Sequence, residues 1–201
     1  MNKLIAAFCL AIISSVCVFA QTGEEYNKNE FFVGYSNQQV DFGERTTFNG
    51  FEGSYVRNVT RYFGIKADVS GAYRNDDFET TFPTSPTTNT TIRTEFKSSL
   101  YNFLGGVQVK DNASEARFKP FGHALAGVAH SRSTIKSPPT LSSPENFTFT
   151  DTGFAAALGG GLDVKINNRF DFRVIQVDYN PIYFRDRFNN NVRLSIGLVF
   201  K

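Results

Sequence analysis

The 201-residue sequence contains only two cysteines and no tryptophan, and its one long apolar run lies at the very start. Residues 1–20 have a basic start at Lys3, an apolar run over 4–18, and Val18 and Ala20 at the −3 and −1 positions before Gln21. This is the layout of a secretory signal cleaved after Ala20. The alternative, a membrane anchor helix, requires about 20 apolar residues, and this run is shorter.

The absence of cysteine after residue 20 excludes several kinds of chemistry. Both cysteines, Cys9 and Cys17, fall within the predicted signal, so the remaining 181 residues have no disulfide, no catalytic thiol and no thiolate metal ligand. Two histidines, His123 and His130, are too few to indicate a dedicated metal site. We therefore expect no metal and no cofactor.

The chain also lacks a large excess of either sign of charge. Without Lys3 the chain has 20 basic and 19 acidic side chains, so we expect no nucleic-acid partner. No second apolar run is long enough to cross a membrane as a helix, and the mean hydropathy is −0.25. These values argue against a helical membrane protein, but they are compatible with a membrane β-barrel, in which only alternate residues contact lipid.

The last ten residues give the clearest positive signal. Apolar residues alternate there with Arg193, Ser195 and Gly197, and a period of two predicts a β-strand with one apolar and one polar face. Only Val199 departs from the alternation. We interpret this segment as the closing strand of a barrel, and we expect its lipid face to consist of Val192, Leu194, Ile196, Leu198 and Phe200.

Seven further segments show similar alternation. The third places Lys66 and Asp68 on one face, which a dry sandwich core would not accommodate. The seventh starts and ends with different parities, and a β-bulge near residues 174–176 would reconcile them, with Gln176 and Asp178 facing inward. The eight predicted strands span about 31–37, 48–57, 63–73, 96–110, 118–130, 154–164, 170–179 and 192–200.

The connections between these segments alternate in length. Residues 74–95 and 131–151 are rich in Thr, Ser and Pro, and we expect long flexible loops there; 38–47 and 180–191 are polar connections. The intervening turns are short, as an up-and-down barrel with tight turns at one rim requires. We predict an all-β, eight-stranded antiparallel transmembrane barrel over 30–201, with a flexible leader over 21–29.

The polar faces, taken as inward, carry four acids and four bases. This equality indicates a salt-bridged lumen, because unpaired charges in a water-poor interior are costly. An eight-stranded barrel is just wide enough for its own side chains to fill, so a general pore is not expected; a narrow porin-like conduit is the alternative. The predicted network comprises Glu52, Lys66, Asp68, Asp163, Lys165, Asp171, Arg173 and Arg193.

The chain resembles the small eight-stranded outer-membrane barrels of the OmpA-like and OmpX-like family. The resemblance rests on the signal ending at Ala20, the Gly/aromatic segments 101–109 (YNFLGGVQV) and 154–164 (FAAALGGGLDV), and the terminal VRLSIGLVF. It implies a cell-envelope protein in outer-membrane lipid, inserted by the barrel-insertion machinery that recognises a terminal aromatic. Here Lys201 follows Phe200. We expect a monomer, and we expect no peptidoglycan-tethering role of the kind that the larger relatives have.

Catalysis is not expected. Some barrels of this size are similar to lipid A acyl-modifying enzymes, which need His, Ser and a carboxylate together at the outer rim, and His130 with Ser131 and Ser133 is the candidate here. No orienting acid can be assigned to it, and we interpret the acidic pair Asp76 and Asp77 as a solubilising part of a loop.

We therefore expect a structural or surface-interaction role, with the two Thr/Ser/Pro-rich segments as the contact surface. The alternative from another class is a secreted soluble β-barrel that binds a small apolar ligand. Lumen charges argue against it, because an apolar ligand requires an apolar pocket. The soluble alternative predicts apolar ridges that face an oily centre.

Overall fold

The computed structural model describes residues 26–41, 45–85, 88–113, 115–136, 147–184 and 187–201. The predicted signal and most of the predicted leader lie outside these residues. Within them, no helix is both long enough and apolar enough to span a membrane.

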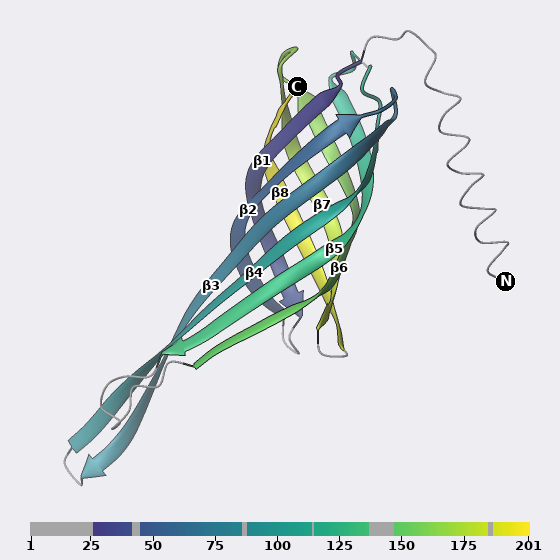
Figure 1. Cartoon of the computed structure of the whole chain (residues 1–201). Helices are drawn as coiled ribbons and strands as arrows, with labels where there is room; N and C mark the ends of the chain where they lie inside the picture. Colours follow the sequence, from purple (N-terminus) through teal and green to yellow (C-terminus); the bar gives the residue numbers. More distant parts are fainter. Residues whose placement is uncertain (1–25, 42–44, 86–87, 114, 137–146, 185–186) are drawn as a thin grey trace, which may run out of the picture.

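Eight antiparallel strands close into one barrel in chain order, with β1 paired to both β2 and β8 (Figure 1). Strand β1 begins and β8 ends at the same rim, which we call the terminal rim; the opposite one is the extended rim. The predicted fold class is confirmed. The strands are β1 (Asn29–Asp41), β2 (Arg45–Asn58), β3 (Phe63–Ser85), β4 (Thr88–Lys110), β5 (Phe118–Lys136), β6 (Phe147–Lys165), β7 (Phe170–Phe184) and β8 (Arg187–Phe200).

The apolar ridges of the strands face outward. On β3, Ile65 is 59% exposed, whereas the neighbouring Lys66 is 1% exposed and faces the barrel axis. On β8, Leu194, Ile196, Leu198 and Phe200 are exposed, Val192 is half-buried, and Arg193 is fully buried. Val199, which broke the alternation by its chemistry, keeps the inward parity and is buried. This arrangement is the reverse of a soluble barrel with an oily centre.

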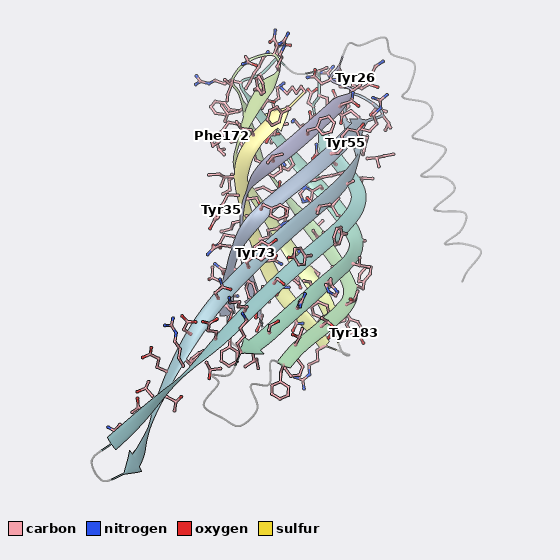
Figure 2. All side chains as sticks on the ribbon, turned by 60° about the vertical axis from the view of Figure 1, so that its left-hand side comes forward. Tyr26, Tyr35, Tyr55, Tyr73, Phe172 and Tyr183 are labelled. Atoms are coloured by element: carbon pink, nitrogen blue, oxygen red, sulfur yellow. The ribbon has the colours of Figure 1, made fainter. Side chains whose placement is uncertain are left out.

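Aromatic side chains lie on the outer face towards both rims. Tyr55 lies towards the terminal rim, and Tyr73 and Tyr183 lie towards the extended rim (Figure 2). At the closure of the barrel, Phe200 stands opposite Phe31 of β1 and Phe170 of β7, and its ring is 5.2 Å from that of Phe170. Such rings are typical of the lipid–water boundary of membrane barrels.

The prediction of a flexible loop over residues 74–95 is wrong. Strands β3 and β4 continue through it as a hairpin, with Phe78 opposite Thr94 and an irregularity only near Pro83. Cross-strand contacts support the pairing: the Phe78 and Phe96 rings meet edge to face at 5.5 Å, and Thr81 and Thr91 hydroxyls lie 3.0 Å apart. Threonine favours strands, and this local preference acts without any apolar alternation.

The other connections at the extended rim are also shorter than predicted. Strand β5 continues to Lys136 and β6 begins at Phe147, within the expected loop over 131–151; residues 137–146 of that loop lie outside the described residues. Likewise β1 and β2 occupy most of 38–47, and β7 and β8 most of 180–191. The predicted alternation of long and short connections is therefore wrong, because the strands themselves lengthen at this rim: three of its four connections have two or three residues, against four to seven at the terminal rim.

The predicted β-bulge in β7 is confirmed. The register between β7 and β8 shifts between Arg173 and Gln176, and Val174 and Ile175 are both exposed. Two consecutive outward residues restore the parity that places Arg173, Gln176 and Asp178 inside.

Candidate functional site: the charged lumen and its two mouths

The lumen nearest the terminal rim holds a charged layer. Lys110 of β4 donates hydrogen bonds to both carboxylate oxygens of Glu30, at 3.1 and 3.0 Å, and to Oδ2 of Asp163 at 2.8 Å. Arg173 of β7 donates to the same Asp163 carboxylate at 2.8 and 3.2 Å. One aspartate of β6 is therefore shared by bases from two other strands.

Two aromatic rings enclose the Arg173 guanidinium. Its central carbon lies 4.4 Å from the Phe32 ring centroid and 3.9 Å from that of Phe121. The Phe32 ring lies over Gly34 and Gly197, where an added Cβ would come within 2.6 and 2.9 Å of ring atoms. The two glycines therefore make room for the ring, which in turn makes a cation–π contact with the arginine.

A second charged layer lies at mid-barrel around Arg193 of β8. Its Nη1 atom donates to Asp68 at 2.9 Å, and its Nη2 atom donates to Asp178 at 2.7 Å. Glu52 accepts from Ser195 at 2.6 Å and from Gln176 at 2.8 Å. Lysine 66 completes this layer, with Nζ 3.6 Å from Asp68 and 4.0 Å from Glu52.

Gln176 joins the two layers. Its carbonyl oxygen accepts from Arg173 at 2.7 Å, while its amide nitrogen donates to Glu52 and Asp178, each at 2.8 Å. Because an amide has both a donor and an acceptor end, it can bridge the base of the layer nearest the terminal rim and the acids of the mid-barrel layer. The charges consequently form one connected network.

His123 of β5 lies in this network as well. Lys66 Nζ is 3.3 Å from its Nδ1, and Asp178 Oδ1 is 2.8 Å from its Nε2. An ammonium group has no acceptor, so Nδ1 accepts and the ring proton belongs on Nε2, facing the carboxylate. The histidine therefore serves as a neutral bridge between a base and an acid.

Towards the extended rim the lumen becomes apolar. Gln38 donates to Asn180 at 2.8 Å, and beyond this pair the inward side chains form a hydrophobic cluster. Apolar side chains thus take many of the inward positions in this part of the barrel. The cluster consists of Val40, Phe48, Ala72, Leu100, Leu104, Leu125, Ala129, Ala155, Ala157, Ile182 and Phe184.

Seven of the eight charges predicted for the network are fully buried in the lumen: Glu52, Lys66, Asp68, Asp163, Asp171, Arg173 and Arg193. Lys165 lies at the terminal rim instead, bound to the exposed Glu115. Sequence reasoning missed Glu30 and Lys110. Glu30 continues the inward parity of β1 one residue before the predicted strand, and Lys110 has the inward parity at the last residue of the predicted fourth strand, so following the alternation to both strand ends would have found them.

The candidate catalytic residues do not converge. The Nδ1 atom of His130 lies 2.7 Å from the Thr152 hydroxyl on the outer face, whereas Ser131 and Ser133 have the opposite parity and line a cavity of about 670 Å³ at the extended rim. Asp76 is paired with Arg74, in the same strand. Within the described residues no three His, Asp or Glu side chains are arranged to hold a metal ion.

A closed antiparallel barrel with an apolar outside and a charged inside is a transmembrane β-barrel. The sequence matches the family model described as "Outer membrane protein beta-barrel domain" over residues 6–200. The chain belongs to this family and is a protein of the outer membrane. In such barrels the longer excursions of the chain lie on the extracellular side, and β3 and β4 extend furthest at the extended rim, so we expect the terminal rim to face the periplasm and the extended rim to face outside.

Solved structures of outer-membrane barrels are similar to this chain. Ail, the attachment invasion locus protein of Yersinia pestis, is 18% identical, with 88% of this chain and 100% of that chain covered and a TM-score of 0.57. OprG from Pseudomonas aeruginosa is 12% identical, with 89% and 97% covered and a TM-score of 0.51. Another Ail structure is a complex with the heparin analogue sucrose octasulfate. No curated protein matches the sequence.

Proposed function

We propose that this outer-membrane barrel neither catalyses a reaction nor conducts solutes, and that it presents the β3–β4 hairpin to an extended segment of an extracellular protein. The observation that carries the proposal is the length of that hairpin beyond the barrel wall (Figure 1). Residues 74–94, which we call the extension hairpin, pair with each other but with no neighbouring strand among the described residues.

Both edges of the extension hairpin have unpaired backbone. The pairing of β2 with β3 stops at Asn49 and Tyr73, and that of β4 with β5 stops at Glu95 and Lys136. Twelve residues of β3 lie beyond the first limit, a length of about 40 Å at the usual rise per residue. Unpaired N–H and C=O groups in such a row accept an added strand.

The side chains keep this edge soluble. Asp77 and Glu79 are exposed on one face of the hairpin, and Arg93 donates to Asp77 at 2.5 Å across the strands. Charges on an edge strand oppose uncontrolled edge-to-edge aggregation. The same charges leave the backbone groups of the edge available to a partner strand whose side chains are compatible with them.

The lumen supports the non-conducting part of the proposal. We infer that the predicted charge network, with Glu30, Lys110 and Asp178 added, has a structural role: it fills the barrel and ties seven strands together. The apolar cluster towards the extended rim offers no polar group that could bind an ion. The outward position of His130 relative to Ser131 and Ser133 supports the absence of catalysis.

The closing strand β8 bears on how the protein is inserted into the membrane. We infer that the protein is a monomer in outer-membrane lipid and that the insertion machinery recognises its closing strand, with the exposed Phe200 near the end. Lys201 turns its side chain back to Asp171 in the lumen and therefore leaves the outer face of the strand clear.

The contact proposal is tested with ten-residue peptides of alternating apolar and polar sequence, added to the protein in immobilised nanodiscs. Peptides are N-methylated at odd or at even positions, which removes the donors of one edge and keeps the side chains. We expect one of the two methylated series to lose binding and the other to keep it. Equal loss, equal retention, or no binding by any peptide would contradict strand addition.

A shortened protein provides the matched control. Residues 79–93 are replaced by Asn-Gly, which joins Phe78 and Thr94 where they already face each other. The barrel should still migrate as a folded, heat-modifiable species, and peptide binding should disappear. Undiminished binding to the shortened barrel would assign the contact elsewhere.

A further inference from the structure

A polar pocket of about 290 Å³ opens at the periplasmic mouth of the barrel. Three lysines line it: Lys119 of β5, Lys165 of β6, and Lys201, which follows β8. Tyr26, labelled at this rim in Figure 2, and Asn112 of the β4–β5 turn also lie in its wall. The pocket is separate from the extension hairpin, which lies at the other end of the molecule (Figure 1).

Two of the lysines have their own carboxylates. Lys165 is bound to Glu115, whose carboxyl pKa the ammonium group lowers from its ordinary value, so the pair stays charged. Lys201 is bound to the buried Asp171. Neither of these bases adds a net charge to the pocket.

Lys119 differs from them. It is 4% exposed, and the nearby carboxylates of the described residues, Asp163, Asp171 and Glu115, form their ion pairs with other bases. Asp163, opposite it on β6, already serves Lys110 and Arg173. The neighbouring base is Lys201, and both lysines interact electrostatically with Asp171 and with Glu115, which are already bound to Lys201 and Lys165.

The balance of charge in this half of the lumen gives the same result. Described side chains in the layer nearest the periplasm comprise four bases and three acids, so one positive charge is in excess. A buried like-charge contact is costly unless an opposite charge joins it. The groups are Lys110, Lys119, Arg173 and Lys201 against Glu30, Asp163 and Asp171.

Asn112 provides an independent indication. It is 4% exposed, and both its Oδ1 and Nδ2 atoms are buried without a hydrogen-bond partner. Buried amides are normally satisfied, and the exceptions require an explanation such as a missing ion or water. Its NH₂ group suits the oxygen of an anion.

We propose that the periplasmic mouth is a binding site for a phosphate-type oxyanion, held by Lys119 and Lys201 with a hydrogen bond from Asn112. The volume suits a phosphate group with its hydration, and the anion supplies the negative charge that this layer lacks. Its source is either free phosphate in the periplasm or the headgroup of a phospholipid from the inner leaflet.

The test is calorimetric titration of inorganic phosphate into the full-length barrel in dodecyl maltoside micelles, which contain no phosphate, at constant ionic strength. We expect saturable binding that weakens at least tenfold in Lys119→Gln and at least threefold in Asn112→Ala. The matched control is Lys136→Gln, the same charge change on an exposed lysine at the opposite rim. Absence of saturable binding, or equal weakening in the control, would overturn the proposal.

A thermal measurement keeps the test independent of the titration. Without phosphate, Lys119→Gln should unfold at a higher temperature than the wild type, because one repelling charge is gone. Phosphate should raise the unfolding temperature of the wild type and not that of the variant; equal increases would contradict the site. Repeating the titration in phosphatidylcholine nanodiscs identifies the source: a headgroup that occupies the pocket weakens the binding of free phosphate relative to micelles, whereas a site for the free anion binds phosphate equally in both.

Discussion

Replacing Arg193 by glutamine should cause the largest loss of stability of any single lumen substitution. The guanidinium is fully buried, donates to Asp68 and Asp178, and lies 3.5 Å from Glu52. Without it, three buried carboxylates face Lys66 as the only remaining buried cation of that layer among the described residues. Glutamine keeps part of the side-chain volume, so the change removes charge more than packing.

The magnitude follows from the cost of leaving buried charges unpaired. Breaking one buried ion pair by removing a single partner costs about 3–5 kcal/mol. Arg193 has three acidic neighbours, but Gln176, Ser195 and Lys66 still bind those acids, so the loss should stay near the upper end of that range. We expect a decrease in the free energy of unfolding of about 4–5 kcal/mol.

The assay is guanidinium titration of the barrel in detergent, followed by gel mobility without boiling, because the chain has no tryptophan for fluorescence. Arg132→Gln is the control, since Arg132 is exposed on the extended wall. It should change the unfolding free energy by less than about 0.5 kcal/mol. A loss below about 1 kcal/mol for Arg193→Gln would refute the network as a stabilising element.

Three further predictions concern packing and permeation. Phe121→Leu removes one face of the Arg173 sandwich and should cost about 2 kcal/mol in the same titration, whereas Phe118→Leu on the lipid face should cost less than half as much; equal losses would exclude a cation–π contribution. Gly34→Ala places a Cβ 2.2 Å from a backbone oxygen of β8 and should lower stability by about 1–3 kcal/mol, and an unchanged midpoint would contradict the tight closure. In planar bilayers the protein should show no steady conductance of porin size; such steps would disprove the filled lumen.

The sequence predicted the barrel wall well because lipid and lumen impose opposite demands on neighbouring residues. Ile65 beside Lys66, or Leu194 beside Arg193, leaves one solution for the facing of each strand. The bulge in β7 was predictable for the same reason. The two ends of this strand have opposite inward and outward parity, and one extra residue between them is needed to keep both ends facing correctly.

The extension hairpin was not predictable by this route. Beyond the membrane both faces of a strand meet water, so Thr81 and Thr91 can face each other on a strand pair that has no apolar side. Threonine and serine in series then resemble a loop. The strand preference of threonine was the one available signal, and it was outweighed by the prolines nearby.

The facing of β5 was hard to predict because its two faces differ in size and not in polarity. Phe121, His123 and Leu125 point inward, and small residues such as Ala124 and Ala126 point to lipid. An inward histidine flanked by apolar residues gives no alternation of charge to detect. It therefore escaped the predicted network, although it bridges Lys66 and Asp178.

The number of lumen charges can be predicted from the sequence, but their positions along the barrel axis cannot. Six acids and six bases are buried in the described lumen, so the total is balanced. The layer around Arg193 nevertheless has three acids and two bases, and the layer nearest the periplasm has the reverse excess. A barrel that was only filled for stability would gain by exchanging one charge between the layers. The positive excess instead faces an open pocket at the periplasmic mouth, where an anion from outside the chain can neutralise it.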